Sequence, residues 1–167
     1  DFQGVRIGSL NSNEPIERLT PGLDAVLSDP ARPKWTVVTF HHPIFSAAKE
    51  RDNPTLRAAW RPLLEKHGVD LVLQGHDHAS ARSGLGGPRD GVSGPKMYPL
   101  QEMRDVARVA SGVQLFKVIH MKADRIRYEA RLASGELYDA FELEKSAEGV
   151  SRLIEKPADV EEIRAMP

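Results

Sequence analysis

Residues 35–43 read WTVVTFHHP and residues 70–78 read DLVLQGHDH. Each segment is a short apolar run that ends in histidines, and such runs are typical of strands buried on both faces. Between them, Asn53-Pro54 is a helix start and Lys66-His67-Gly68 is a helix end. A strand, a helix and a second strand within about 40 residues predict a βαβ unit with parallel strands and a right-handed crossover.

The chain before this unit predicts one more strand and one more helix. Val5–Leu10 alternates loosely and ends in a polar cluster, as a strand would. Thr20-Pro21 is the expected helix start, with Thr20 as N-cap and Pro21 as first residue, and the helix should end near Asp29-Pro30.

The chain after the unit changes its hydrophobic period. Residues 83–95 are expected to form a Gly- and Pro-rich loop, and Met103–Val109 a helical turn. Residues 85–91 are nearly all loop formers, so a strand is expected to be missing from this part of the chain. Alternating segments at 113–121, 125–132 and 137–143 predict an antiparallel meander with one face in water. The fold class is therefore α/β.

Composition limits the classes of protein that fit. With 167 residues and 40% hydrophobic content, the chain can bury a single core. We predict one domain over residues 1–145 and a charged tail over 146–167, which allows a short helix near Pro157. A formal net charge of −1 argues against nucleic acid as a structural partner, and no apolar run long enough to favour a membrane partner is visible. Without cysteine, a metal would need ligands such as histidine or carboxylate.

Four of the 6 histidines follow the two buried strands, two after each strand. Ligands of open parallel sheets bind outside the carboxyl ends of the strands, so these histidines should share one rim. The pattern Gly-His-x-His at residues 75–78 is itself rare, with about 0.02 chance matches expected for this composition. The predicted metal ligands are His41, His76 and His78, a structural role being the alternative.

The remaining histidines have simpler explanations. His42 is expected to be structural, because neighbouring residues at a strand end point to opposite sides. His67 is explained as a charge at a helix C-terminus, and His120 as a lone strand histidine.

At these residues the chain resembles a known family. Val38-Thr39-Phe40-His41 resembles the V-x-x-H motif of calcineurin-like metallophosphoesterases, and Gly75-His76-Asp77-His78 resembles their G-H-x-H motif, within the purple acid phosphatase branch. The run from Trp35 to Arg82 and the segment 93–98 are also similar to bacterial members of that branch. The resemblance extends over most of residues 1–145.

The resemblance implies a hydrolase that acts on phosphoesters, as a phosphatase or a phosphodiesterase. Two Fe, Zn or Mn ions would hold the phosphoryl oxygens and activate a water as hydroxide for in-line attack. Carried onto this sequence, His41 and His76 would ligate one metal and His78 the other. The fold implied is one half of a four-layer α/β/β/α sandwich, with the βαβ unit in one sheet and the meander in the other.

The family's carboxylate motifs are absent from these 167 residues: we find no G-D-x-x-Y or G-D-x-x-D, and no G-N-H-E or G-N-H-D. Two cations held only by imidazoles would keep about +4 of uncompensated charge, which carboxylates must offset. We therefore expect this chain to need the missing N-terminal half of the domain as its partner, and to be inactive alone.

Three further expectations follow from the resemblance. Arg51 stands where several relatives have a histidine that assists the leaving group, so it is a candidate for phosphate binding, the alternative being an exposed loop arginine. Relatives of this branch are often exported, which favours an extracytoplasmic location. The rival hypothesis is a non-catalytic metal-binding or interaction domain that kept the histidine rim.

Overall fold

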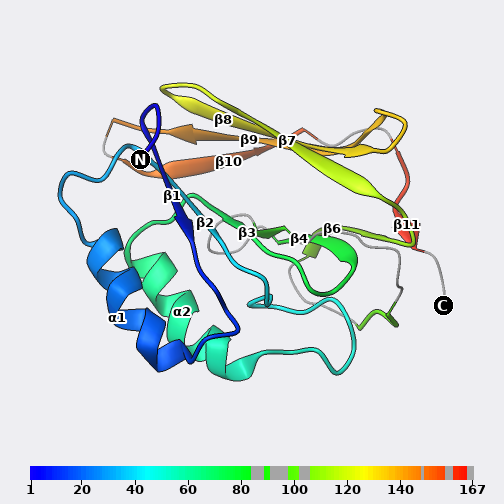
Figure 1. Ribbon diagram of the computed structural model, residues 1–167. Coiled ribbons are helices and arrows are strands. Elements are labelled where there is room, and N and C mark those ends of the chain that lie inside the picture. Colours follow the sequence, from blue (N-terminus) through cyan, green and yellow to red (C-terminus); the bar gives the residue numbers. More distant parts are fainter. Residues whose placement is uncertain (84–88, 91–97, 102–105, 148, 157–159, 165–167) are drawn as a thin grey trace.

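The computed structural model describes residues 1–83, 89–90, 98–101, 106–147, 149–156 and 160–164. Two β-sheets face each other, and both helices lie on the outer face of the larger sheet (Figure 1). The larger sheet has the order β1 (Val5–Ser9), β2 (Trp35–Thr39), β3 (Leu71–Leu73), β5 (Arg89–Asp90), β4 (Ala79–Ser83), β6 (Val106–Ser111), β11 (Ile163–Arg164). The smaller sheet has the order β10 (Ser151–Glu155), β9 (Leu137–Lys145), β8 (Arg125–Leu132), β7 (Leu115–Met121).

The predicted βαβ unit is confirmed as β2, α2 (Pro54–Lys66) and β3. β2 and β3 pair in parallel, with Val37 opposite Leu71 and Thr39 opposite Leu73. α2 follows Asn53 and ends before Gly68, whose φ of +59° is the left-handed conformation expected after a helix. Both histidine segments therefore leave the sheet at the same edge.

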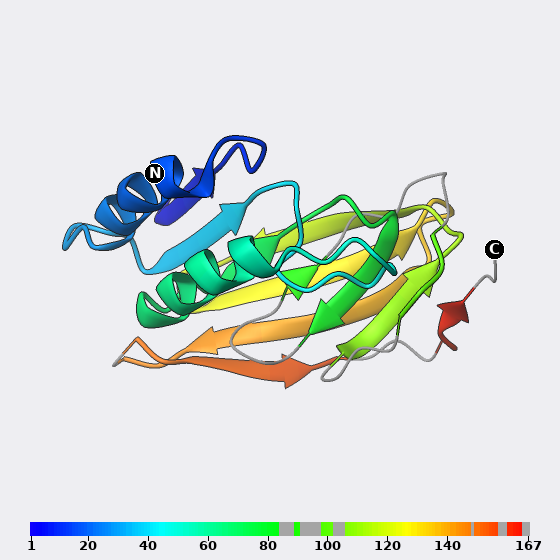
Figure 2. The same cartoon turned by 90° about the horizontal axis from the view of Figure 1, so that it is seen from below.

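The two helices, α1 (Ile16–Leu27) and α2, lie on the same face of the larger sheet (Figure 2), and one apolar core holds them to it. Trp60 is fully buried and meets the Phe40 ring edge-on, with the ring centroids 4.9 Å apart. Its indole N–H donates to Thr20 Oγ1 at 3.0 Å, so the two helices are also joined by a hydrogen bond. The core consists of Leu23, Leu27, Val38, Phe40, Ile44, Leu56, Trp60, Leu64, Val69 and Val72.

The start predicted for α1 is wrong. The helix begins at Ile16, so Thr20 and Pro21 lie inside it. Ile16 and Leu19 pack against the core, and this burial holds a first turn that local capping signals did not indicate. Thr20 donates its hydroxyl proton to the carbonyl of Ile16 at 2.7 Å and does not cap the helix.

A second core fills the space between the sheets. It confirms that β2 is buried on both faces, since Trp35 and Val37 face the smaller sheet while Val38 and Phe40 face the helices. The predicted alternation of β8 is also confirmed by the buried side chains of Ile126, Tyr128 and Ala130. These residues belong to a cluster of Val5, Trp35, Val37, Leu71, Ile126, Tyr128, Ala130, Phe141 and Leu143.

The expectation that a strand is missing after residue 78 is wrong: β4 follows His78 directly and pairs in the larger sheet. This strand was missed because its sequence, ASARS, has no large apolar side chain. Ala79, Ser80 and Arg82 are nevertheless buried. Most of the expected loop at 83–95 lies outside the described residues.

The helical turn expected at Met103–Val109 is wrong over its described part. Val106–Ser111 forms β6, antiparallel to β4 and parallel to β11. Pairing on both edges satisfies the backbone, and Val109 and Ala110 are buried, so tertiary contacts outweigh the weak helical pattern. Residues 103–105 lie outside the described part.

The expected charged tail contributes a strand to each sheet. β10 pairs with β9, with Leu153 opposite Leu143, and β11 pairs with β6. The start of the expected short helix, Pro157, lies outside the described residues, and the domain boundary at residue 145 stays a prediction. Among the described helices, neither is both long and apolar enough to cross a membrane.

Candidate metal centre

The two histidine segments lie side by side because the pairing of β2 and β3 continues past the strand ends. The N–H of Phe40 donates to the carbonyl of Leu73 at 3.2 Å, and the N–H of Gly75 donates to the carbonyl of His41 at 3.0 Å. The topology expected from the sequence thus brings His41 and His76 to one rim of the sheet.

Three imidazoles converge at this rim. Nε2 of His41 and Nδ1 of His76 are 2.9 Å apart, and the ring of His42 lies 4.6 Å from that of His76 between centroids. One ring nitrogen from each of the three histidines lies within 4.8 Å of the other two. Such a spacing lets one small cation reach all three rings.

His42 belongs to this group although the sequence favoured a structural role for it. β2 ends at Thr39 and the chain bends at His41 and His42, so strand alternation no longer decides where the side chains point. Ser12 holds the ring: its Oγ is 2.9 Å from His42 Nδ1 and accepts the backbone N–H of His42 at 3.0 Å. Burial lowers the pKa of His42, and the nearby His41 acts in the same direction. No pattern in the sequence linked Ser12 to His42.

Both ring nitrogens of His76 have partners. Nη2 of Arg51 lies 2.7 Å from Nε2 and donates to the carbonyl of the same histidine at 3.1 Å. Because a guanidinium only donates, Nε2 carries the lone pair and Nδ1 the proton toward His41. Burial lowers the pKa of His76 to about 4, and Arg51 adds to the effect. His76 is therefore neutral at neutral pH.

Arg51 is half-buried and is not an exposed loop side chain. Its guanidinium carbon lies 4.1 Å from the centre of the Tyr98 ring. Its Nε is buried and makes no hydrogen bond in the described part of the structure.

The backbone of the Gly-His-x-His segment is strained at its histidines. His76 has a φ of +74° and His78 a φ of +53°, conformations that are uncommon for residues other than glycine. At Gly75, a Cβ would lie 3.4 Å from Nδ1 of His41, so a side chain at this position would pack directly against the His41 ring.

His78 lies apart from the three-histidine group. Its ring centroid is 5.4 Å from that of Tyr98. Its charge still lowers the pKa of His76, so it belongs to the same electrostatic environment. It stays a predicted ligand.

Asp77, between the two motif histidines, is buried and was not singled out from the sequence. It accepts the hydroxyl proton of Ser46 at 2.9 Å and the N–H of Ala47 at 2.6 Å. Burial raises its pKa, and these hydrogen bonds oppose the rise. Asp77 thereby links the motif to residues 46–48. Both of its carboxylate oxygens are engaged in these hydrogen bonds, so we do not count Asp77 among the metal ligands.

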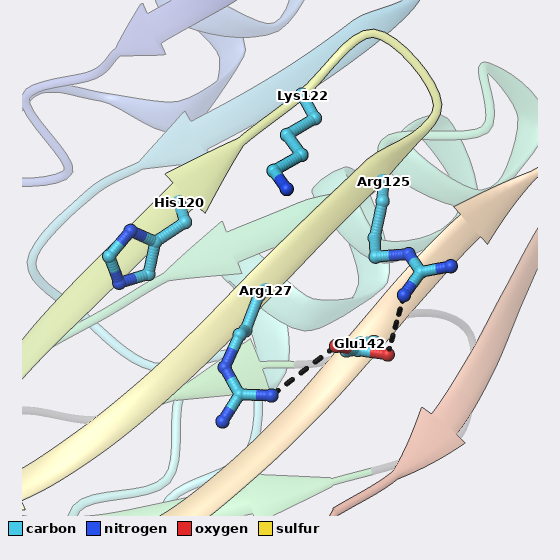
Figure 3. A pocket seen from close by; sticks show the side chains of 5 residues that line it. All are labelled: His120, Lys122, Arg125, Arg127 and Glu142. Carbon is cyan, nitrogen blue, oxygen red and sulfur yellow. Dashed lines mark hydrogen bonds and ion pairs between the residues drawn. The ribbon is translucent and has the colours of Figure 1, made fainter.

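Pockets lie beside the histidine site and on the smaller sheet. One of about 400 Å³ borders His42, Ser12 and the start of α2. Another of about 340 Å³ lies on the outer face of the smaller sheet, lined by His120, Lys122, Arg125, Arg127 and Glu142 (Figure 3). Both of its arginines lie 3.3 Å from Glu142, so ion pairing already occupies them.

The donor set fits one cation better than two. Three imidazoles suit a borderline ion such as Zn²⁺. In the part of the chain that the structure describes, no carboxylate joins the three histidines. The residues present therefore suit one cation and lack the bridging charge for a pair.

Comparison with known proteins agrees with this geometry. The profile of the calcineurin-like phosphoesterase family matches residues 2–80. Purple acid phosphatase 17 of Arabidopsis thaliana is 32% identical over 66 residues, which are 40% of this chain and 19% of that protein. Purple acid phosphatase 4 of the same plant is 42% identical over 45 residues, 27% of this chain and 13% of that protein. The chain thus matches less than a fifth of each of these relatives.

Solved structures share the fold. A purple acid phosphatase from yellow lupin (Lupinus luteus) seeds has a TM-score of 0.71 at 17% identity, over 89% of this chain and 32% of that one. GAP50, the anchor in the inner membrane complex of Plasmodium, has a TM-score of 0.67 at 16% identity, over 98% of this chain and 58% of that one. The mixed α/β architecture described above is therefore a portion of a metallophosphoesterase fold.

Proposed function

We propose that the chain, whose residues 2–80 match the calcineurin-like phosphoesterase family, supplies the histidine half of a phosphoester-hydrolysing site of the purple acid phosphatase branch. The observation that supports this most strongly is the approach of His41 Nε2 and His76 Nδ1 to 2.9 Å at the carboxyl ends of two parallel strands. The proposed substrates are phosphomonoesters or phosphodiesters.

In the proposed site, His41 and His76 hold one cation and His78 holds a second, the ions being Fe, Zn or Mn. Bound cations would supply positive charge for the phosphoryl oxygens and make a water acidic enough to attack near neutral pH. The contribution of this chain is to orient the imidazoles and to keep His76 neutral. With the pKa of His76 at about 4, protons do not compete for its ring at neutral pH.

Arg51 is the proposed phosphate-binding residue. When Nδ1 of His76 faces a cation, the ring proton resides on Nε2, which then no longer accepts a hydrogen bond from Arg51. The guanidinium then loses one of its two contacts with His76, keeps the bond from Nη2 to the carbonyl, and has its other N–H groups for phosphate oxygens. Its planar fork suits two such oxygens at once.

The carboxylates that the site lacks are proposed to come from an N-terminal half of the domain in a longer parent protein. The small fraction of each curated relative that the chain matches is consistent with this proposal. An extracytoplasmic location is proposed from the family resemblance alone.

A non-catalytic interaction domain is the second candidate. The fold of GAP50, which is described as the anchor in the inner membrane complex of Plasmodium, extends over 98% of this chain. At 16% identity that likeness concerns the fold alone, so the fold does not choose between the two functions. Carboxylate motifs encoded upstream of Asp1 would favour the enzyme, and their absence would favour the interaction domain.

The test is hydrolysis by the protein expressed from the complete reading frame. We expect turnover of p-nitrophenyl phosphate or its diester that requires Zn, Fe or Mn and is lost on chelation. His76→Ala should abolish it, whereas His120→Ala, on the outer face of the smaller sheet, should retain it. A folded protein that shows no turnover with any of these metals would support the interaction domain instead.

A further inference from the structure

We propose that His42 is a third imidazole ligand of the cation held by His41 and His76, so that this chain forms a three-histidine site for one Zn²⁺-like ion. The inference deepens the proposed function and rests on its placement of the first cation. It differs from the family pattern, which uses only the first histidine of the pair.

The distances place His42 within reach. Ligand nitrogens around a tetrahedral Zn²⁺ with bonds of 2.0 to 2.1 Å stand about 3.3 Å apart. The two nitrogens of His41 and His76 are already 2.9 Å apart, and the whole set spans no more than 4.8 Å. Small side-chain rotations close the remaining gap, and no strand has to move.

The hydrogen bonds of His42 fit a metal ligand, because they engage one ring nitrogen and leave the other for the ion. Ser12 engages Nδ1 at 2.9 Å and also anchors the backbone N–H of His42. In the described part of the chain, Nε2 of His42 makes no hydrogen bond. A proton on Nδ1, donated to Ser12, leaves the lone pair on Nε2, as a metal requires.

A purely structural role would leave a different pattern. A structural histidine normally has both ring nitrogens satisfied within the fold. The ring of His42 instead lies 5.0 Å from the ring of His41 and 4.6 Å from that of His76, next to a hollow of about 400 Å³ that gives access from solvent.

The test is a titration of residues 1–167 with Co²⁺, followed by displacement with Zn²⁺. Tetrahedral Co²⁺ absorbs in the visible range, so the number of ligands is read without any turnover. Wild type should bind one ion with an intense tetrahedral spectrum. His42→Ala should weaken binding by about 100-fold or more and lose that spectrum. Ser12→Ala should weaken binding by about 10-fold, because Ser12 orients the ring of a ligand without touching the ion.

The control is His120→Ala, on the outer face of the smaller sheet, which should bind the ion like wild type. His42→Gln covers the case in which His42→Ala does not fold, since it keeps a polar group for Ser12, and it should bind as weakly. Unchanged affinity in His42→Gln, or no binding by wild type, would overturn the proposal. The hydrolysis assay on the longer protein is independent, so failure of that function is seen separately.

Discussion

Replacing Arg82 with methionine should lower the free energy of unfolding, because it removes ion pairs that join the two sheets. The Arg82 side chain is 3% exposed and joins β4 of the larger sheet to two acids of the smaller sheet. Nε donates to Asp139 Oδ2 at 2.6 Å and Nη2 to Asp139 Oδ1 at 3.2 Å. Nη1 and Nη2 donate to the two oxygens of Glu155 at 2.9 and 2.8 Å.

The magnitude follows from which acid loses its partner. Asp139 is 4% exposed and would be left as an unpaired buried carboxylate, which costs about 3 to 5 kcal/mol. Glu155 is 46% exposed and would regain water, so it adds little. Against a total stability of about 5 to 15 kcal/mol for a domain, Arg82→Met should remove a large share.

The assay is urea unfolding at 25 °C followed by circular dichroism. Glu155→Gln is the matched control and should cost less than about 1 kcal/mol. The double variant Arg82→Met with Asp139→Leu should recover most of the loss, because no buried charge is left. A loss below about 1 kcal/mol in Arg82→Met, or no recovery in the double variant, would refute the reasoning.

Three further outcomes are expected. Trp60→Ala, at a fully buried position, should lower the free energy of unfolding by about 3 to 5 kcal/mol in the same urea assay. Hydrogen bonds from Arg127 and then Arg131 hold the pKa of Glu129 below its ordinary 4.5. The stability that ionised Glu129 contributes is therefore present above pH 4.5 and is lost as the pH falls through the lowered pKa. When unfolding is measured from about pH 7 to about pH 3, Glu129→Gln should lose less free energy of unfolding than wild type. Arg51→Met should raise the affinity for the first cation about tenfold, because it removes a positive charge and the hydrogen bond of Arg51 to the ring of His76. The same change should lower turnover of the longer protein. Unchanged Co²⁺ affinity would contradict this.

The parts of the fold that were predictable have strong local signals. β2 and β3 are continuous apolar runs, and α2 combines an Asn-Pro start, a one-sided apolar face and a Gly stop. These three elements also place His41 and His76 at one rim, because the ends of parallel strands share an edge.

The parts that were missed depend on contacts distant in sequence. β4 has no apolar pattern of its own, and its Arg82 is stabilised by acids more than 50 residues away. The first turn of α1 is held by packing of Ile16 and Leu19 rather than by a cap. His42 joins the site through a bend and a hydrogen bond to Ser12, neither of which has a sequence signature.

The number of metal ions per chain tests the central claim most directly. Residues 1–167 should be loaded separately with Zn, Fe and Mn, freed of excess metal and measured by elemental analysis. Without bridging carboxylates the chain should hold at most one ion, and its hydrolysis of an aryl phosphate should stay near background, whereas the longer protein should hold two. Two firmly held ions per chain in residues 1–167, with rapid hydrolysis, would contradict the half-site account.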